Sequence, residues 1–489
     1  MPQLKEFITH VTGAQLVMPD GLENDQASVL QQEFDAISTD TRTLPPGAIF
    51  IGLSGPRFDG AAFLQAAQDR GACAAVLSAT AAAHRSGVRL PLILVPDALG
   101  ALQQWARHWR SRWAGRCIAV TGSNGKTTVK QMIQSIAEAD LGPPQVWATP
   151  GNLNNHIGVP LSVLGLRPAH QLAVFELGMN HPNEIAALAE IAQPRVALVN
   201  NAQREHQEFM KSVQAVAIEN GAVFGALPAE GIAIYPRDPL HEAIWQKQSQ
   251  HLKHPAIRFG MRDLAAATPA VAREVLGQWI TAESGGLLLE IEFPDRQSIV
   301  VKPRGLGLHF ALNMIAAAAC AFAAGLSLKA IEHALNTFEP VAGRGRAIAI
   351  AAGGTVVDDT YNANPDSVRA AIDALARMGV PRALVLGDMG EVGDQGPQFH
   401  REVLDYAAQR HLDAIWLHGE AMALAHRQTG VGQFFDEVSA LIASVSHWIG
   451  VQQQAQHRPS LWIKGSRFMR MERVVQAIAR QQEGQAACC

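Results

Sequence analysis

A glycine-rich turn between an apolar run and a helical pattern constrains this chain more than any other feature. The run "CIAVTG", which begins at Cys117, has no polar alternation and is typical of a buried parallel strand. The turn contains Gly122 and Gly125, and the helical pattern "TTVKQMIQSIAEA" follows it. This order predicts a loop whose backbone N–H groups face inward and can bind phosphate at the start of a helix.

The residues of the turn have the chemistry of a nucleotide site. Lys126 can reach the β- and γ-phosphates, and the hydroxyl of Thr127, or of Thr128, can bind Mg²⁺. The pattern GxxGKTT is shorter than the usual GxxxxGK[ST], because Val120 occupies the place of the first glycine. An ordinary strand–turn–helix with a surface lysine is the alternative. The predicted ATP-binding residues of the loop are Gly122, Ser123, Asn124, Gly125, Lys126, Thr127 and Thr128.

Two further residues are candidates for binding a metal beside the phosphates. Glu176 ends the apolar run "LAVFE", and His206 follows the next apolar run in "NNAQREHQE". A glutamate and a histidine could both hold a divalent cation near the γ-phosphate. From the residues alone, Glu176 could equally cap a helix or form a salt bridge, and His206 could be a surface histidine.

Composition excludes several classes of protein. The chain has 489 residues, of which 48% are apolar and 17% charged, so it is neither disordered nor a small disulfide-stapled protein. A net charge of −4 gives no support for nucleic-acid or anionic-membrane binding. The five cysteines are scattered and form no CxxC pair, which favours a reducing, cytoplasmic compartment. The longest apolar stretch, residues 310–326, predicts a buried helix and no membrane span.

Strands alternate with helical patterns along most of the chain, which predicts an α/β fold with mostly parallel sheets. We expect three domains: a small N-terminal α/β domain over 1–113, a central phosphate-loop domain over 114–339 and a Rossmann-like α/β domain over 340–489. A stretch at about 230–304 reads as β-rich. In open parallel sheets ligands lie beyond the carboxyl ends of the strands, so polar residues there are the candidate site.

Eight motifs along the chain occur together in one enzyme family. They are "TGSNGKTT", "GNLNNHIGVPLSVL", "FELGMNHPNEI", "GLHFALN", "GRGRA", "DDTYNANPDS", "LGDMGEVG" and "IKGSRFMRMERVV". With the N-terminal "ISTDTRTLPPGAIFIGLSGPRFDGAAF", they resemble the Mur ligases, the cytoplasmic ATP-dependent amide-forming enzymes of peptidoglycan synthesis. The resemblance covers about residues 36–475.

The resemblance implies a three-domain enzyme. Its first domain binds the UDP end of a nucleotide sugar, its second binds ATP, and its third closes over the site. "YNANP" and "KGSR" are similar to the member that joins D-alanyl-D-alanine to UDP-N-acetylmuramoyl-tripeptide through an acyl phosphate. The implied cofactors are ATP and Mg²⁺, and the implied partners are these two substrates. We expect a cytoplasmic monomer that binds no nucleic acid and has no integral membrane segment.

The resemblance also implies roles for single residues. The expected catalytic residues are Lys126, Glu176, His206 and Arg344, and the expected metal ligands are Thr127, Glu176 and His206. Beyond the phosphate loop, ATP contacts are implied for His309, Asn313, Arg344, Asp359 and Asn362. Substrate contacts are implied for Thr41, Arg42, Asn154, Asn155, Tyr361 and Asn364.

Structural explanations compete with several of these roles. Asn154 and Asn155 could be turn asparagines, and His309 and Asn313, which share a helix face, could be structural. Asn364 followed by proline also predicts an N-cap and the first helical position. Thr41 and Arg42 lie beside a turn around Leu44-Pro45-Pro46 that would explain them structurally as well.

The sequence departs from the family pattern at two positions. Several sister enzymes carry a carbamylated lysine that helps bind a second metal, and that position falls here on Asn220, which cannot be carbamylated. Glu219 or water could replace the charge, or the second metal is held differently. Phe310 stands where relatives usually have an asparagine, so adenine contact would rest more on Asn313.

Three other functions compete with the peptide ligase. A folylpolyglutamate-synthase-like amide ligase is the first alternative, but that relative lacks the N-terminal domain. An ATP-binding regulatory protein without turnover is the second. An NAD-dependent dehydrogenase is disfavoured, because no GxGxxG opens the first helix of the third domain.

Overall fold

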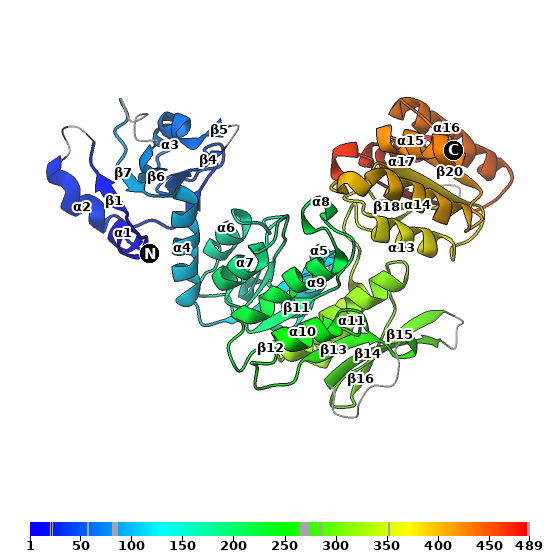
Figure 1. Ribbon diagram of the computed structural model, residues 1–489, viewed down its shortest axis with the longest axis horizontal. Coiled ribbons are helices and arrows are strands. Elements are labelled where there is room, and N and C mark those ends of the chain that lie inside the picture. The colour runs from blue at the N-terminus through cyan, green and yellow to red at the C-terminus, as the bar shows by residue number, and fades with distance from the viewer. Residues whose placement is uncertain are drawn as a thin grey trace. The chain divides into compact units, whose positions relative to one another are not determined.

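The computed structural model describes the whole chain except residues 20, 22, 56–57, 81–86, 265–272, 283–285, 351–352 and 487–489. The chain forms two compact units. The first comprises Met1–Ala119, Pro144–Gly178 and Ala186–Arg195, and the second comprises Val120–Pro143, Met179–Ile185 and Val196–Cys489. The expected α/β class with three sheet-bearing regions is confirmed (Figure 1). The three domain boundaries expected from the sequence stay a prediction.

A five-stranded sheet organises the N-terminal part of the first unit, in the order β1-β7-β6-β3-β2. Trp105 on a neighbouring helix is fully buried, with its ring 5.2 Å from that of Phe7 and 5.7 Å from that of Phe34. The strands are β1 (Gln15–Val17), β2 (Ile37–Ser38), β3 (Ile49–Gly52), β6 (Ala74–Ser78) and β7 (Leu92–Val95), with β4 (Ser54–Gly55) pairing β5 (Phe58–Asp59). The helices are α1 (Leu4–His10), α2 (Gln26–Gln31), α3 (Leu64–Asp69) and α4 (Ala98–Ser111).

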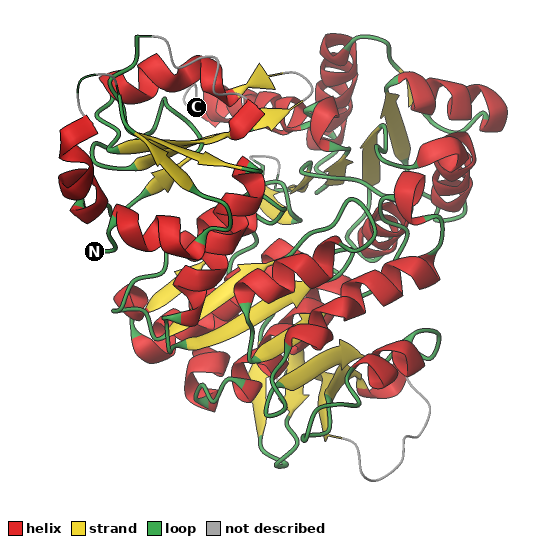
Figure 2. Ribbon diagram, turned by 60° about the vertical axis from the view of Figure 1, so that its left-hand side comes forward, coloured by secondary structure: helices red, strands yellow, loops and turns green. Residues whose placement is uncertain are grey.

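A nine-stranded sheet follows, in the order β16-β15-β14-β13-β12-β11-β8-β10-β9. Strands β11 to β14 pair in parallel, whereas β15 and β16 are antiparallel, so the β-rich stretch expected near 230–304 forms this edge. Figure 2 shows the strands side by side with helices against them. The strands are β8 (Arg116–Thr121), β9 (Val146–Ala148), β10 (Leu172–Glu176), β11 (Val196–Val199), β12 (Ile232–Pro236), β13 (Ile257–Met261), β14 (Arg273–Thr281), β15 (Leu287–Glu292) and β16 (Ser298–Val301).

The helices of this region include the apolar stretch seen in the sequence. Helix α11 (Leu308–Ala323) buries most of its residues, and no helix among the described residues is long and apolar enough to cross a membrane. The expectation of a buried helix is therefore confirmed. The other helices are α5 (Lys126–Leu141), α6 (Gly158–Leu164), α7 (Glu184–Ala192), α8 (Gln207–Met210), α9 (Val213–Gly221), α10 (Glu242–Gln248) and α12 (Leu328–Thr337).

The last third forms a six-stranded sheet, in the order β17-β18-β22-β19-β20-β21, with only β17 antiparallel to its neighbour. Successive strand residues point to opposite faces, so Val357 and Val356 enter two different cores. One core packs against α13 (Pro365–Leu375), α14 (Gly396–Ala408) and α15 (Glu420–Thr429), and the other against α16 (Val438–Gln454) and α17 (Glu472–Ala486). The strands are β17 (Arg346–Ala349), β18 (Thr355–Asp359), β19 (Arg382–Gly387), β20 (Ala414–His418), β21 (Gln433–Phe434) and β22 (Ser460–Lys464).

A buried arginine joins α4 to the end of α7 in the first unit. The Arg110 guanidinium donates hydrogen bonds to the carbonyls of Ala192 at 2.7 Å, Gln193 at 2.8 Å and Trp113 at 2.9 Å. A cation at a helix C-terminus also interacts favourably with the helix dipole.

We expect Arg110→Ala to lower the free energy of unfolding by about 2–4 kcal/mol, because one buried and two partly buried hydrogen bonds lose their charged donor. The control is Arg107→Ala, which removes a solvent-exposed ion pair with Glu190 and should change stability by less than about 1 kcal/mol. Urea unfolding followed by tryptophan fluorescence measures both. Equal effects of the two substitutions would contradict this interpretation.

A buried histidine holds the loop after β19. Met389 donates its backbone N–H to His400 Nε2 at 2.9 Å, so the ring is neutral and its Nδ1–H donates to the Gly396 carbonyl at 2.7 Å. Burial lowers the pKa of His400, against the opposing effects of the Gly396 carbonyl and the Asp388 charge.

In the unfolded chain His400 therefore binds a proton at pH ~6.5, whereas in the folded chain it stays neutral at that pH. We expect the melting temperature to fall as the pH drops from about 7 towards 5. Part of this fall should disappear in His400→Gln and remain in the control His457→Gln, whose side chain is exposed. Thermal melts of the three proteins across this pH range measure the difference. A pH dependence that is identical in all three would refute the role of His400.

Candidate functional site

The predicted strand–turn–helix is present, and its two glycines have left-handed backbone angles. Gly122 has φ 124° and Gly125 has φ 82°, and α5 begins at Lys126 directly after the turn. A Cβ at Gly125 would lie 2.4 Å from Asn313 Oδ1 and 2.7 Å from Asn200 Nδ2. Glycine is therefore required at this position both by conformation and by space.

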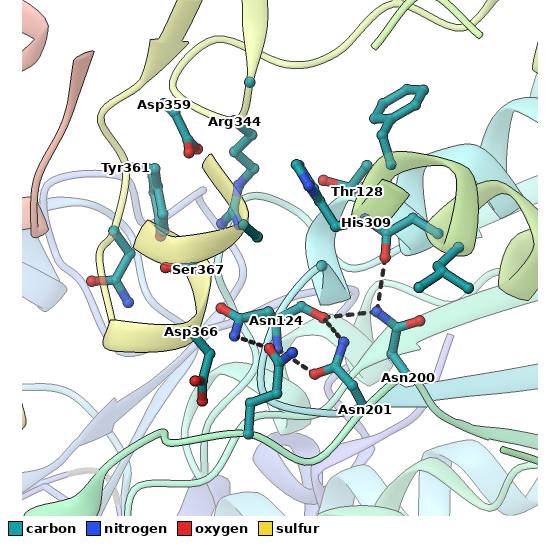
Figure 3. Close-up of a pocket in the computed structure, with 18 of the residues that line it drawn as sticks. Asn124, Thr128, Asn200, Asn201, His309, Arg344, Asp359, Tyr361, Asp366 and Ser367 are labelled. Carbon is teal, nitrogen blue, oxygen red and sulfur yellow. Dashed lines mark hydrogen bonds between the residues drawn. The ribbon is translucent and has the colours of Figure 1, made fainter. Parts of the chain in front are cut away.

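The segment after β11 packs against this phosphate loop. The Asn124 N–H donates to Asn201 Oδ1 at 2.8 Å, and the amides of Asn200 and Asn201 donate to the Asn124 carbonyl at 2.7 and 2.9 Å (Figure 3). Gln203 adds a backbone bond to Ser123 Oγ at 2.9 Å and accepts from Asn124 Nδ2 at 2.6 Å. These three residues were not predicted from the sequence, although the polar run "NNAQREH" at the carboxyl end of a strand could have indicated them.

The side chain of Lys126 folds back over the phosphate loop that precedes it. Its Nζ is 2.6 Å from the Gly122 carbonyl, 3.2 Å from the Ser123 carbonyl and 2.8 Å from Glu205 Oε1. The ammonium group is thus held at the mouth of the loop and paired with a carboxylate that the sequence analysis did not single out.

His206 lies among carboxylates, and its side chain is only 12% exposed. Its Nδ1 is 3.0 Å from Glu391 Oε2, and its Nε2 is 3.6 Å from Glu205 Oε1. Burial lowers the pKa of His206, but the hydrogen bond to Glu391 and the charges of both glutamates outweigh burial and raise the pKa. The same hydrogen bond is the main cause that lowers the pKa of Glu391.

Glu176 belongs to the first unit, where it is buried at the end of β10. Asn154 donates its Nδ2 to Glu176 Oε1 at 2.8 Å, and Glu176 donates its own N–H to Thr149 Oγ1 at 3.0 Å. Oε2 of Glu176 is buried and has no hydrogen-bond partner. A buried, unpaired carboxylate oxygen is costly, so the residue suits a cation ligand better than a structural carboxylate.

Two of the remaining predicted residues of the first unit, Asn155 and Arg42, have structural partners. Asn155 Oδ1 accepts from the backbone of Ile157 and Gly158 at the start of α6. Arg42 is exposed and pairs with Asp40 at 2.6 Å. The substrate contacts expected of Thr41, Arg42, Asn154 and Asn155 stay predictions.

A cavity of about 290 Å³ lies within the second unit. One side is formed by the phosphate loop and α11, and the other by residues at the carboxyl ends of β18 and β22 and the start of α13 (Figure 3). The cavity brings together nine of the predicted residues, namely Asn124, Gly125, Thr128, His309, Asn313, Arg344, Asp359, Tyr361 and Asn362.

The α11 wall combines amide and apolar groups. Asn313 Oδ1 accepts from Asn200 Nδ2 at 2.9 Å, and the buried Phe310 supplies an aromatic surface next to it. Burial lowers the pKa of His309, so its imidazole is neutral at pH ~7. This wall therefore offers one amide and one aromatic surface in the places where the sequence predicted a base contact.

Two cationic side chains, Lys464 and Arg344, organise the opposite wall of the cavity. Lys464 Nζ lies 2.8 Å from Asp359 Oδ2 and 2.9 Å from the Asn362 carbonyl, and it is buried. The Arg344 guanidinium stacks on the Tyr361 ring, 4.0 Å from its centroid. Lys464 thereby positions the loop that carries the predicted ATP-contact residues, a role that the sequence analysis did not assign.

Asn364 caps a helix, as the sequence predicted, and its expected substrate contact stays a prediction. It forms a capping box with Ser367 at the start of α13, with Pro365 in the first helical turn. Its Nδ2 also donates to Asn124 Oδ1 at 2.9 Å, across the cavity from its own helix. The helix start thus contacts the phosphate loop directly.

The residue in place of the family lysine supports the loop. Asn220 Oδ1 accepts from the Gly122 N–H at 2.8 Å, and its Nδ2 donates to the Val216 carbonyl at 3.1 Å. Both oxygens of Glu219 accept backbone N–H groups, from Asn183 and Ile185. Both side chains are thus used on backbone groups of the protein. Among the described residues, no group of three or more His, Cys, Asp or Glu is placed to hold a metal.

Three family models match the chain in succession. They are the Mur ligase family, catalytic domain, over residues 33–110, the Mur ligase middle domain over 120–321, and the Mur ligase, glutamate ligase domain, over 343–467. Together they cover both units and every element that lines the cavity.

Curated relatives and solved structures agree with these models. The UDP-N-acetylmuramoyl-tripeptide–D-alanyl-D-alanine ligase of Escherichia coli is 36% identical over 91% of this chain and 93% of its own length. The ligase of that name from Haemophilus influenzae is 33% identical over 91% of this chain and 94% of its own. The crystal structure of MurF from Acinetobacter baumannii superposes with a TM-score of 0.84 at 28% identity, covering 98% of this chain and 99% of that one. The chain therefore belongs to the Mur ligase family.

Proposed function

We propose that this protein is the ATP-dependent ligase that adds D-alanyl-D-alanine to UDP-N-acetylmuramoyl-tripeptide. The observation that carries the proposal is the cavity of the second unit, in which a phosphate loop faces Arg344, Asp359 and Tyr361. Its volume of about 290 Å³ is near the lower end of ordinary ligand pockets. The identity to the Escherichia coli ligase over 91% of the chain supports the choice of substrates.

The proposed chemistry overcomes the poor electrophilicity of a carboxylate. An oxygen of the tripeptide carboxylate attacks the γ-phosphorus, the bond to the β-phosphate oxygen breaks, and ADP leaves. The amine of D-alanyl-D-alanine then attacks the acyl carbon, loses a proton and displaces phosphate. The residues of the chain hold these groups in line, which supplies much of the rate enhancement.

Cationic side chains must offset the repulsion between a carboxylate and a triphosphate. We assign this to Lys126 at the loop and to Arg344 on the opposite wall, because preorganised charge near the reacting oxygens stabilises the transition state. For Lys126 to reach a γ-phosphate it must leave Glu205, to which it is bonded at 2.8 Å.

Mg²⁺ is part of the proposal, and the residues fit it. The unpartnered Oε2 of Glu176 is a ligand of the kind that Mg²⁺ prefers. Thr127 and His206 are the other two proposed ligands. When bound, Mg²⁺ would neutralise charge on the phosphates.

We also propose the remaining sites and the setting of the reaction. Thr41 and Arg42 would contact the uridine end, Asn154 and Asn155 the sugar-peptide, and Tyr361 and Asn364 the dipeptide. A cytoplasmic setting is supported by the cysteines, because Cys73, Cys117 and Cys320 are all buried and unpaired. The monomeric state is part of the proposal. A folate-type ligase is the weaker candidate, since the family match includes residues 33–110, which such a ligase lacks.

Phosphate release from ATP, with the two substrates added singly and together, tests the function. We expect release only with both, together with a UDP-pentapeptide product. Lys126→Met should lower kcat about 10²–10³-fold, as when one transition-state donor is removed, whereas Lys253→Met, at an exposed ion pair with Glu230, should not change it. ATP binding without release in the presence of both substrates would overturn the proposal.

The replacement of the family lysine by Asn220 predicts independence from bicarbonate. Because an amide cannot be carbamylated, kcat should be the same in carbon dioxide-depleted buffer and in buffer with added bicarbonate. The same assay on Asn220→Ala should raise KM for ATP, since the Gly122 N–H loses its acceptor. A rate that rises with bicarbonate in the wild-type protein would show that another lysine carries this modification.

A further inference from the structure

Arg204 connects the segment after β11 to two helices of the last third of the chain. Its backbone N–H donates to Asp366 Oδ2 at 2.8 Å, and its Nε and Nη2 donate to Asp366 Oδ1 at 3.0 and 2.6 Å. Its Nη1 and Nη2 also donate to Glu402 at 2.7 and 3.0 Å. Asp366 lies in the first turn of α13, and Glu402 lies in α14.

The contact is a shaped site for a guanidinium. The Arg204 side chain is 17% exposed, and its guanidinium lies over the Phe399 ring, 5.2 Å from the centroid. Four guanidinium bonds to two carboxylates and an aromatic face use the planar fork of arginine, which the point charge of a lysine cannot reproduce.

The neighbours of Arg204 face the phosphate loop. Gln203 binds Ser123 and Asn124, Glu205 binds Lys126, and His206 binds Glu391. His206 has φ 47°, a left-handed angle that costs energy in a residue with a side chain, so surrounding contacts must hold it. Arg204, two residues earlier in the chain, supplies such contacts.

We propose that Arg204 is a positioning residue for the ligase reaction. Its bonds to Asp366 and Glu402 fix residues 203–206, so that Glu205 pairs with Lys126 until a γ-phosphate takes its place and His206 stays beside Glu205. Docking of α13 and α14 and the arrangement of the phosphate loop are therefore coupled through one side chain. The expected effect on kcat rests on the proposed function. The expected effect on the structure of residues 203–206 does not.

Arg204→Ala and Arg204→Lys test the coupling, and Arg369→Ala is the matched control. Arg369 also pairs with Glu402, at 3.0 Å, but has no bond to residues 203–206 in the described structure. We expect kcat to fall about 10- to 100-fold in both Arg204 variants, because displaced reacting groups cost this much. The Kd for Mg²⁺ and a non-hydrolysable ATP analogue, measured by calorimetry, should stay within about threefold of wild type.

Amide hydrogen exchange of residues 200–210 is the second measurement. We expect faster exchange over 203–206 in the Arg204 variants and an unchanged pattern in Arg369→Ala. The Lys variant keeps a cation, so it remains informative where the Ala variant is unstable.

Wild-type kcat and exchange in Arg204→Lys would overturn the inference. The inference would also be overturned if kcat in the Arg204 variants fell only in proportion to a loss of nucleotide binding and a lower melting temperature. That pattern is expected of a purely structural residue. If the wild-type protein releases no phosphate with both substrates, the proposed function fails. The exchange and nucleotide-binding measurements then still decide whether Arg204 fixes the segment.

Discussion

The site depends on the hydrogen bonds between the phosphate loop and the segment that follows β11. Asn200 and Asn201 both donate to the Asn124 carbonyl, and Asn201 accepts the Asn124 N–H in return. These bonds fix the backbone between two glycines that need left-handed angles, which alone would leave a flexible turn. Asn220 adds support from below through Gly122. A loop held in this way keeps its inward N–H groups in place before phosphate binds. The entropy cost of ordering the loop on binding is therefore small.

The second wall of the cavity has a different origin. Alternating residues of β18 and β22 enter two cores, and this double burial fixes where both strands end. Asp359 and Lys464, the last residues of these strands, meet as an ion pair in which the lysine is buried and the aspartate is partly buried. Such a pair contributes little net stability after desolvation, but leaving either charge alone would be costly. The pair therefore specifies one position of the loop that follows β18, and Tyr361 and Asn362 are placed by it.

Local pattern was enough to predict the phosphate loop, the α/β class and the capped helix at Asn364. Each depends on neighbours in sequence: a glycine turn, strand–helix alternation, or an asparagine before proline. The roles of Glu205 and Arg204 could not be predicted in this way, because the residues that they contact are distant in sequence. Arg204 bonds to Asp366, 162 positions away, and Lys126 bonds to Glu205, 79 positions away. The topology of two sheets brings these residues together, and no periodicity within one segment encodes it.

The departure from the family pattern at Asn220 fits the charges around the phosphate loop. A carbamylated lysine would place a negative charge beneath the loop, whereas Asn220 places a neutral acceptor there and uses it on the Gly122 N–H. Glu219 next to it is used on the backbone N–H groups of Asn183 and Ile185. Negative charge near Lys126 comes instead from Glu205, on the other side of the loop. Glu205, which pairs with Lys126, is next to Arg204 in the chain. Arg204 in turn bonds to α13 and α14 through Asp366 and Glu402. In this chain the charge at the phosphate loop is thus tied to the position of the last third of the molecule.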